Sequence, residues 1–369
     1  MEVDEGALRR NFRALADRAG AGSRLLPMLK ADGYGVGAVR VARALADLDP
    51  WAWGVATVEE GAELRRAGRE ERIVVFSPCP PLDADRVVEA GLEPAVASLE
   101  SLEAFGAAAP GRGELPVHLE VDTGMGRLGL VAEERDRWIP ELRRLLAERP
   151  LELASTFTHF HSAESDRGAT REQAAIFRSV VADLQEAGLD LGPLHLANSA
   201  ALLRHPETVE GLARPGLYLY GGLGGEPVVS VRARVLEVRE VPAGHTVSYG
   251  ARFRTSRPAR LATLGIGYGD GLRRELSEGG AALLAGRRVP IRGAVCMDVT
   301  VVDVTDVGGV EPGDVATVLG RDGGEELTLE EIAETCGTIP YEILTGLGRR
   351  LPRVDRRGAG GEGQEEDVA

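Results

Sequence analysis

The chain has 369 residues, of which 43% are hydrophobic and 27% are charged. At roughly 150 residues per domain this length predicts about two domains, and the ordinary composition excludes a wholly disordered or fibrous protein. Asp and Glu together number 58 against 43 Lys and Arg, so the formal net charge is −15. A field of this sign repels nucleic acid and anionic lipid, which argues against either as the main partner.

Cysteine usage and the N-terminal residues predict a cytoplasmic protein. The three cysteines, Cys79, Cys296 and Cys336, are widely spaced and form no CxxC pair, which is typical of reduced thiols. Three of the first five residues, Glu2, Asp4 and Glu5, are acidic, and we expect no signal peptide because no apolar segment follows them. No run of 18 apolar residues occurs, so no transmembrane helix is expected.

The first 220 residues alternate between short apolar runs and longer segments in which apolar residues recur at i, i+3 and i+4. The strand-like runs are 25–29, 53–55, 73–76, 93–96, 117–121, 151–158, 194–196 and 217–219. The clearest helical segments between them are 58–67, 98–107, 133–148 and 170–186. Eight such alternations predict an α/β fold, a (β/α)8 TIM-type barrel over residues 1–225. A doubly wound sheet is less favoured because no GxGxxG follows the first strand.

The pattern changes after the glycine-rich residues 221–225. Period-two alternation over 228–241 and short β runs at 260–264, 289–291, 299–304 and 315–319 predict a second, mostly β C-terminal domain over 226–357. One helix is expected inside it, at 329–336. The Gly- and Glu-rich residues 358–369 are expected to form a disordered tail.

Lys30, the only lysine of the chain, follows the first apolar run and is expected to end the first strand. Functional residues of a (β/α)8 barrel lie at the carboxyl ends of its strands. A lysine there is costly to bury unless it is paired, neutral or covalently used, although it could simply extend its ammonium to the rim. The glycines of segment 31–37 let a ligand approach the backbone closely, which favours a functional lysine.

Three further strand ends carry polar groups. Arg127 lies in the glycine-rich segment 120–129, where its guanidinium could bind a carboxylate or pair structurally with Glu120 or Asp122. Near the seventh strand, Asn198 or Ser199 can cap a helix, and a phosphate could bind there. Gly216, in a segment expected to open the eighth strand, offers a backbone donor nearby.

A histidine pair on the sixth strand raises the alternative of a metal site. His159 and His161 share one face of a strand, as in some barrel hydrolases. A full ligand set would need histidines on two other strands and a late aspartate; His195 follows the seventh strand, but the set is incomplete and its order is unusual. A histidine in a polar network is therefore preferred, and no metal is predicted.

Seven motifs, in this order, closely resemble the fold-type III, pyridoxal-phosphate-dependent alanine racemases. They are residues 30–35, 122–129, 197–200, 214–216, 247–251, 267–271 and 296–298. The resemblance runs from Val3 to Arg353, and it implies a homodimeric isomerase that binds pyridoxal 5′-phosphate. The implied reaction interconverts L-alanine and D-alanine, which supplies D-alanine for peptidoglycan in the bacterial cell wall.

The resemblance also implies a role for individual residues. Lys30 resembles the Schiff-base lysine and one of two bases, and Tyr249 the opposite base, supplied by the second domain across the dimer. A phenol with a pKa near 10 is a poor base unless cations nearby lower that pKa. The resemblance further implies that His159 and Arg214 form a network behind Tyr249, with Arg214 on the pyridine nitrogen. Tyr34, Ser199 and the Gly216 amide would contact the phosphate. Arg127 and the Met297 amide would bind the substrate carboxylate, and Tyr268 would line the entrance.

Two residues depart from the family pattern. Arg349 aligns with a late tyrosine near the phosphate, and no role is assigned to it. The other departure is Glu120. Many members carry a carbamylated lysine before the Asp-Thr-Gly motif, and its negative end holds the arginine; this chain has Glu120 there. We expect Glu120 to supply the anion for Arg127 directly. Three alternative functions remain. The first is a racemase of another small amino acid such as serine. The second is a same-fold decarboxylase, although Cys336 lacks the sequence setting of the cysteine that such enzymes use, and the third is a cofactor carrier built on the barrel alone, which the presence of a second domain argues against.

Overall fold

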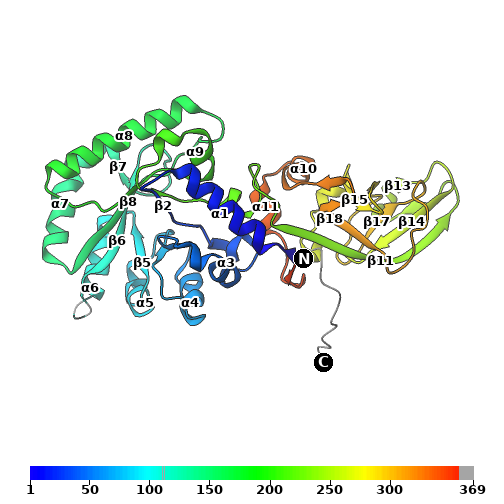
Figure 1. Ribbon diagram of the computed structural model, residues 1–369, viewed down its shortest axis with the longest axis horizontal. Helices are drawn as coiled ribbons and strands as arrows, with labels where there is room; N and C mark the ends of the chain where they lie inside the picture. The colour runs from blue at the N-terminus through cyan, green and yellow to red at the C-terminus, as the bar shows by residue number, and fades with distance from the viewer. Residues whose placement is uncertain (110, 112, 357–369) are drawn as a thin grey trace. The chain divides into compact units, whose positions relative to one another are not determined.

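The computed structural model describes residues 1–109, 111 and 113–356, so the predicted tail at 358–369 lies outside the described residues. Two compact units form (Figure 1). One comprises Arg9–Gly225, and the other comprises Met1–Leu8 together with the described residues from Glu226 onward. Among the described residues of both units, no helix is long and apolar enough to cross a membrane.

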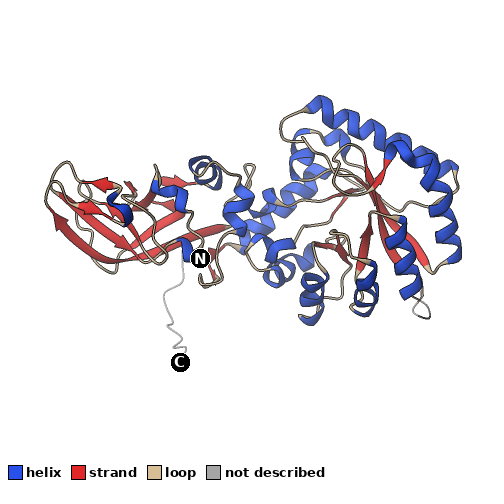
Figure 2. Ribbon diagram, turned by 180° about the vertical axis from the view of Figure 1, so that it is seen from behind, coloured by secondary structure: helices blue, strands red, loops and turns tan. Residues whose placement is uncertain are grey.

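Eight parallel strands form the barrel of the first unit, which confirms the predicted TIM-type fold (Figure 2). In order they are β2 (Arg24–Leu25), β3 (Trp53–Val55), β4 (Ile73–Val75), β5 (Glu93–Val96), β6 (Leu115–Asp122), β8 (Leu151–Phe157), β9 (Leu194–His195) and β10 (Leu212–Ala213). Strands β3 to β9 form one sheet, to which β7 (Leu130–Val131) adds through β6. Pairing of β10 with β2 and the single bridges Asn198–Arg214 and Met28–Gly54 close the ring.

Helices alternate with these strands and lie outside the ring (Figure 2). They are α1 (Glu5–Ala19), α3 (Ala38–Leu45), α4 (Val58–Arg66), α5 (Ala84–Glu89), α6 (Leu99–Ala108), α7 (Arg135–Glu148), α8 (Arg167–Glu186) and α9 (Ser199–Arg204). The short segment α2 (Lys30–Tyr34) follows β2 and has left-handed backbone angles. Side-chain caps define several starts: Thr57 and Glu60 form a capping box on α4, and Asn198 caps α9.

Two local expectations at strand ends are wrong. Residues 217–219 are not the eighth strand: Leu217–Tyr220 is a 3-10 helix, and the strand is β10, earlier in the chain. Pro215 has no N–H to donate to a ladder, and Gly216 adopts φ −125° and ψ −95°, so the segment turns after the strand instead of opening it. Lys30 also does not end a strand, because it begins α2.

The second unit is mostly β, as predicted. Its long central strand β11 (Val229–Val241) pairs antiparallel with β1 (Glu2–Val3), β14 (Ala259–Leu264) and β18 (Val315–Asp322). Around these lie β12 (Thr246–Val247), β13 (Phe253–Arg254), β15 (Ala281–Leu284), β16 (Arg287–Pro290), β17 (Thr300–Asp303), β19 (Glu325–Leu327), β20 (Val354–Asp355), α10 (Leu329–Thr335) and α11 (Pro340–Thr345). The pairing of β1 with β11 explains why the first eight residues belong to this unit.

Candidate active site

Lys30 begins a turn of unusual handedness at the mouth of the barrel. The four residues after it, 31–34, have φ values of 54°, 54°, 60° and 55°, so the backbone winds in the left-handed sense. This conformation costs about 1–2 kcal/mol for each residue that has a Cβ. Strain of this kind persists only where the surroundings enforce it, and it is concentrated at functional sites.

Two carboxylates hold the strained turn in place. Glu60 accepts hydrogen bonds from the backbone N–H groups of Ala31 and Ala56, each at 2.7 Å. Asp32 accepts one from the N–H of Ala38 at 2.9 Å. The helix cap that begins α4 therefore also fixes the backbone beside Lys30. Sequence analysis missed this role of Glu60, although the pattern Thr57-x-x-Glu60 was a readable capping signal.

The surroundings of Lys30 favour its neutral amine. Burial lowers the pKa of Lys30, the positive charges of Arg127 and Arg214 lower it further, and Glu60 opposes them. Part of the side chain is nevertheless exposed at the barrel mouth. Lys30 thus combines access with desolvation, and the deprotonated amine is the form that attacks carbonyl groups.

Three of the predicted phosphate contacts lie together in one cradle. The Gly216 N–H donates to Ser199 Oγ at 2.8 Å, and a Cβ added at Gly216 would lie 2.3 Å from the Tyr34 hydroxyl. Tyr34 stacks on Tyr220 with ring centroids 4.6 Å apart, and the Tyr220 hydroxyl donates to the Met28 carbonyl at 2.8 Å. Only glycine fits at position 216, and the two tyrosines fix the wall opposite it.

Arg214 is buried and bound on several sides. Its Nη1 donates to Nδ1 and to the carbonyl of His195, both at 2.7 Å, and its Nη2 donates to the Thr158 carbonyl at 2.7 Å. A longer contact of 3.4 Å reaches Nδ1 of His159. Burial lowers the pKa of Arg214 to about 10, which still leaves the guanidinium charged at neutral pH.

His159 is held neutral beside this cation. Burial lowers the pKa of His159 to about 3, and the charges of Arg214, Arg127 and Lys30 contribute. The alternative metal pair is not supported by the geometry of its second member, because exposed His161 bonds to Ser162. Within residues 1–109, 111 and 113–356, no three His, Cys, Asp or Glu side chains are grouped so that they could hold a metal ion.

Glu120 lies on β6, and Arg127 lies in the loop that follows this strand. Glu120 is only 6% exposed, and burial raises its pKa to about 7 even though the charges of Arg214 and Arg127 lower it. The loop that carries Arg127 is folded around Asp122, whose carboxylate accepts the N–H groups of Gly124 and Gly126. Among the described residues, Glu120 and Arg127 interact through their charges and share no ion pair within 4.0 Å.

The other three predicted site residues lie in the second unit, on loops that contact one another. Tyr249, Tyr268 and Met297 are 74%, 43% and 51% exposed. The N–H of Gly269, in the Tyr268 turn, donates to the Met297 carbonyl at 2.8 Å. Ser248 Oγ, beside Tyr249, lies 3.3 Å from Cys296 Sγ. The three residues thus share one exposed region of this unit.

The barrel residues suit a small anionic ligand that bears a carbonyl group. Ser199, Gly216 and Tyr34 form a cradle that a Cβ would fill, buried Arg214 supplies a fixed cation, and Lys30 supplies an amine. A phosphate suits such a cradle of backbone and hydroxyl groups. These groups come from different βα loops at one end of the barrel, where the catalytic sites of this fold lie.

Comparison with known proteins places both units in one family. The model of the alanine racemase N-terminal domain matches residues 3–224, and that of the alanine racemase C-terminal domain matches residues 228–355. The chain is 37% identical to the alanine racemase of Carboxydothermus hydrogenoformans, covering 96% of this chain and 98% of that protein.

Two solved structures are similar over nearly the whole chain. Alanine racemase from D-cycloserine-producing Streptomyces lavendulae is 35% identical, with a TM-score of 0.92 over 97% of this chain and 96% of that one. Alanine racemase from Bartonella henselae, with covalently bound pyridoxal phosphate, is 30% identical, with a TM-score of 0.87 over 96% and 98%.

Proposed function

The chain belongs to the alanine racemase family, and we propose that it interconverts L-alanine and D-alanine with Lys30 and Tyr249 as its two acid–base groups. As a member of this family it is an isomerase that depends on pyridoxal 5′-phosphate. The observation that best supports the assignment of residues is the cradle of Tyr34, Ser199 and Gly216 close to the desolvated Lys30.

The barrel residues fit this cofactor. Tyr34, Ser199 and the Gly216 amide would hold its phosphate, Arg214 its pyridine nitrogen, and Lys30 its aldehyde carbon. When bound, the cofactor supplies an electron-accepting ring that stabilises negative charge at the substrate α-carbon. Because Arg214 remains charged, it would donate to the ring nitrogen of the bound cofactor and disfavour protonation there. This restraint favours return of the proton to the α-carbon over transamination.

Racemisation needs a proton removed from one face of the α-carbon and a proton delivered to the other. Two groups on opposite faces accomplish this without turning the substrate, and we assign these roles to Lys30 and to the partner subunit's Tyr249. The lowered pKa of Lys30 leaves part of its amine free to accept a proton. His159 and Arg214 would hold the tyrosine in place through the network behind it.

The remaining assignments concern substrate and assembly. We propose that Arg127 and the Met297 amide bind the substrate carboxylate, that Glu120 orients Arg127, and that Tyr268 lines the entrance. The exposed region that carries Tyr249 would contact a second copy of the chain, forming a homodimer with shared sites. Free thiols at Cys79, Cys296 and Cys336 are in keeping with a cytoplasmic enzyme.

Reductive trapping tests the cofactor assignment. Borohydride treatment of the enzyme loaded with pyridoxal phosphate should attach the cofactor at Lys30, the only ε-amine in the chain. Peptide mass spectrometry would locate it, and Lys30→Ala should abolish both the adduct and the visible absorption band. A wild-type protein that shows no band after addition of pyridoxal phosphate would contradict the proposal.

Isotope exchange tests the reaction. Incubation with L-alanine in deuterated water should yield α-deuterated D-alanine. A same-fold decarboxylase would instead release carbon dioxide. Faster turnover of serine than of alanine would indicate a serine racemase. Tyr249→Phe should stop racemisation in both directions and mainly lose α-proton exchange with L-alanine, while Lys30 still exchanges the proton of D-alanine. Equal loss of α-proton exchange from both enantiomers would contradict the two-base assignment.

A further inference from the structure

A line of buried polar side chains runs through the barrel behind Arg214. The His195 ring makes two hydrogen bonds: its Nδ1 accepts from Arg214, and its Nε2 lies 2.8 Å from Ser155 Oγ. The same oxygen lies 2.6 Å from Nδ1 of His118, and Nε2 of His118 lies 3.0 Å from a carboxylate oxygen of Glu93. His195, Ser155 and His118 are completely buried.

Each member of this line comes from the next strand of the barrel. His195 lies in β9, Ser155 in β8, His118 in β6 and Glu93 in β5. A register shift between β6 and β8, after Val117, places His118 opposite Ser155. Irregularities of this kind redirect side chains, and here the shift connects two strands through their polar groups.

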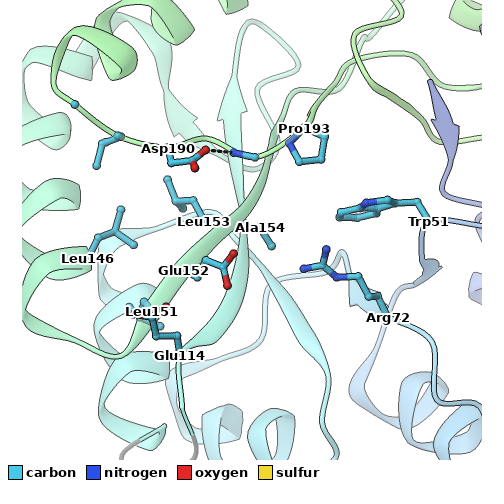
Figure 3. Close-up of a pocket in the computed structure, with 13 residues that line it drawn as sticks. Trp51, Arg72, Glu114, Leu146, Leu151, Glu152, Leu153, Ala154, Asp190 and Pro193 are labelled. Carbon is cyan, nitrogen blue, oxygen red and sulfur yellow. Dashed lines mark hydrogen bonds between the residues drawn. The ribbon is translucent and has the colours of Figure 1, made fainter. Parts of the chain in front are cut away.

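The line ends at the amino ends of the strands, far along the barrel from its mouth. Arg72, just before β4, donates from Nε to both carboxylate oxygens of Glu93 at 2.9 and 3.0 Å. Its guanidinium lies 4.5 Å from the ring centre of Trp51, and both residues line a cavity of about 390 Å³ (Figure 3). Glu93 is thus an anchored anion at the outer end of the line.

Hydrogen-bonding capacity determines the direction of every proton in the line. A guanidinium only donates, so Nδ1 of His195 is an acceptor and the proton of the neutral ring is on Nε2. That N–H donates to Ser155, whose own hydrogen is then directed to Nδ1 of His118. His118 therefore carries its proton on Nε2 and donates to Glu93. Burial lowers the pKa of both histidines, in accordance with neutral rings.

We propose that Ser155, His118 and Glu93 are positioning residues that hold the His195 ring in one tautomer and orientation and thereby aim the guanidinium of Arg214. The other tautomer of His195 would direct its Nδ1–H at the guanidinium, so two donors would face each other in a dry interior, and a flipped ring would offer a C–H in place of the acceptor. The consequence for catalysis rests on the proposed function, because it assumes that Arg214 donates to the pyridine nitrogen of the cofactor.

This line of hydrogen bonds from Glu93 through His118, Ser155 and His195 to Arg214 is called the relay below. It is tested first in the cofactor-free protein by ¹⁵N NMR of the six histidines. His118 and His195 should each show one neutral tautomer, protonated on Nε2, from about pH 6 to about pH 8. Ser155→Ala should split or broaden the His195 ring signals because Nε2 loses its acceptor. Thr156→Val is the matched control: its hydroxyl is also fully buried on β8, but it donates to the Leu191 carbonyl, outside the line.

The loaded enzyme provides the second measurement, the number of transamination events per racemisation. Transamination transfers the amino group of alanine to the cofactor and releases pyruvate. Ser155→Ala should raise this ratio by about tenfold, which is the effect of one unmade buried hydrogen bond on the preference between two orientations. Glu93→Gln, which keeps the shape but removes the charge, should raise the ratio by a smaller factor, and Thr156→Val should leave it unchanged.

The possible outcomes separate the relay from the proposed function. Unchanged His195 signals and an unchanged ratio in Ser155→Ala would overturn the inference, as would equal changes in Thr156→Val. His195 signals that change as expected, with an unchanged ratio, would overturn the claim that the relay aims Arg214 in catalysis. A protein that binds no pyridoxal phosphate would contradict the proposed function, whereas the NMR result on the cofactor-free protein would still support or overturn the relay.

Discussion

At the scale of single residues, the cations of the barrel mouth divide into fixed charges and one titratable amine. Lys30 is the only lysine among 43 basic residues, and arginine does not lose its proton in the accessible pH range. The arginines 127 and 214 both lower the pKa of Lys30 while they remain charged themselves. Among these cations, therefore, Lys30 is the one that can exchange a proton near neutral pH or form a covalent bond to a carbonyl.

Replacing Glu120 tests the titration of a buried carboxyl group. Its pKa is about 7 in the folded protein and near its ordinary value of about 4.5 after unfolding, so the folded state retains a proton that the unfolded chain releases. The free energy of unfolding should therefore fall as the pH rises from about 5 to about 7, by about 3 kcal/mol in total. Glu120→Gln has no carboxyl group to titrate. As the pH rises from about 5 to about 7, its free energy of unfolding should therefore increase relative to that of wild type by the same amount.

Urea unfolding of the cofactor-free protein at about pH 5 and about pH 8 measures this difference. A stability difference between Glu120→Gln and wild type that does not change with pH would contradict the buried titration. The same variant should also weaken substrate binding, seen as a higher KM for alanine, if the charge of Glu120 orients Arg127.

Gly216→Ala tests the cradle. The new Cβ would lie 2.3 Å from the Tyr34 hydroxyl, so Tyr34 or the loop must move; overpacking of this kind costs about 1–3 kcal/mol. We expect a lower melting temperature and at least about tenfold weaker binding of pyridoxal phosphate in a fluorescence titration. Adding Tyr34→Phe should restore part of the stability but not the affinity, because it removes the closest contact, leaves the ring carbon Cζ 3.0 Å away, and removes a proposed phosphate contact.

The control for this pair is Gly308→Ala, since an added Cβ there meets no atom within 4 Å. It should match wild type in both melting temperature and affinity. Wild-type affinity in Gly216→Ala would show that the phosphate lies elsewhere.

At the scale of elements, the pattern of apolar residues predicted most of the barrel. Trp53–Val55 and Glu93–Val96 were predicted with the bounds that β3 and β5 have, because these buried runs are short and uninterrupted. The eighth strand was misplaced because β10 has only two residues, too few to show a period. The neighbouring run 217–219 is equally apolar but follows Pro215, and it buries its side chains from a 3-10 helix instead.

Contacts between distant side chains could not be predicted in this way. The residues of the cradle were found because each lies in a recognisable motif, whereas the left-handed turn depends on Glu60 reaching back from α4. The line from His195 to Glu93 depends on strand register, including a shift after Val117, and no sequence period reports that shift. His195 was considered only as a possible metal ligand and instead accepts from Arg214.

Glu60→Ala tests the support of the left-handed turn. It leaves the N–H groups of Ala31 and Ala56 without their acceptor, so we expect a loss of about 1–3 kcal/mol of stability and faster hydrogen exchange of residues 31–35. Glu59→Ala is the control from the same helix, because Glu59 is exposed and forms a surface ion pair with Arg86. That variant should differ from wild type by less than about 0.5 kcal/mol. Equal effects of the two variants would contradict a specific role for Glu60.

At the scale of the whole molecule, the two units contribute different chemistry. The barrel carries the amine, the phosphate cradle and the buried arginine, whereas the second unit presents Tyr249, Tyr268 and Met297 in one exposed region. Large apolar and aromatic side chains that cluster on a surface often mark an interface. In the proposed assembly, each site would combine the barrel residues of one copy of the chain with Tyr249 of a second copy.

Mixing two inactive variants tests this arrangement directly. In a heterodimer of Lys30→Ala and Tyr249→Phe subunits, one site would carry both substitutions, and the other would combine Lys30 of one subunit with Tyr249 of the other. Random exchange of equal amounts makes about half of the dimers mixed, each with one intact site, so racemisation of L-alanine should recover to about a quarter of the wild-type rate. If Tyr249 instead served the site of its own chain, every site in every dimer would lack one of the two groups, and no activity would return. Exchange can be verified by mass spectrometry of differently tagged subunits, and confirmed exchange without recovery would contradict the shared site.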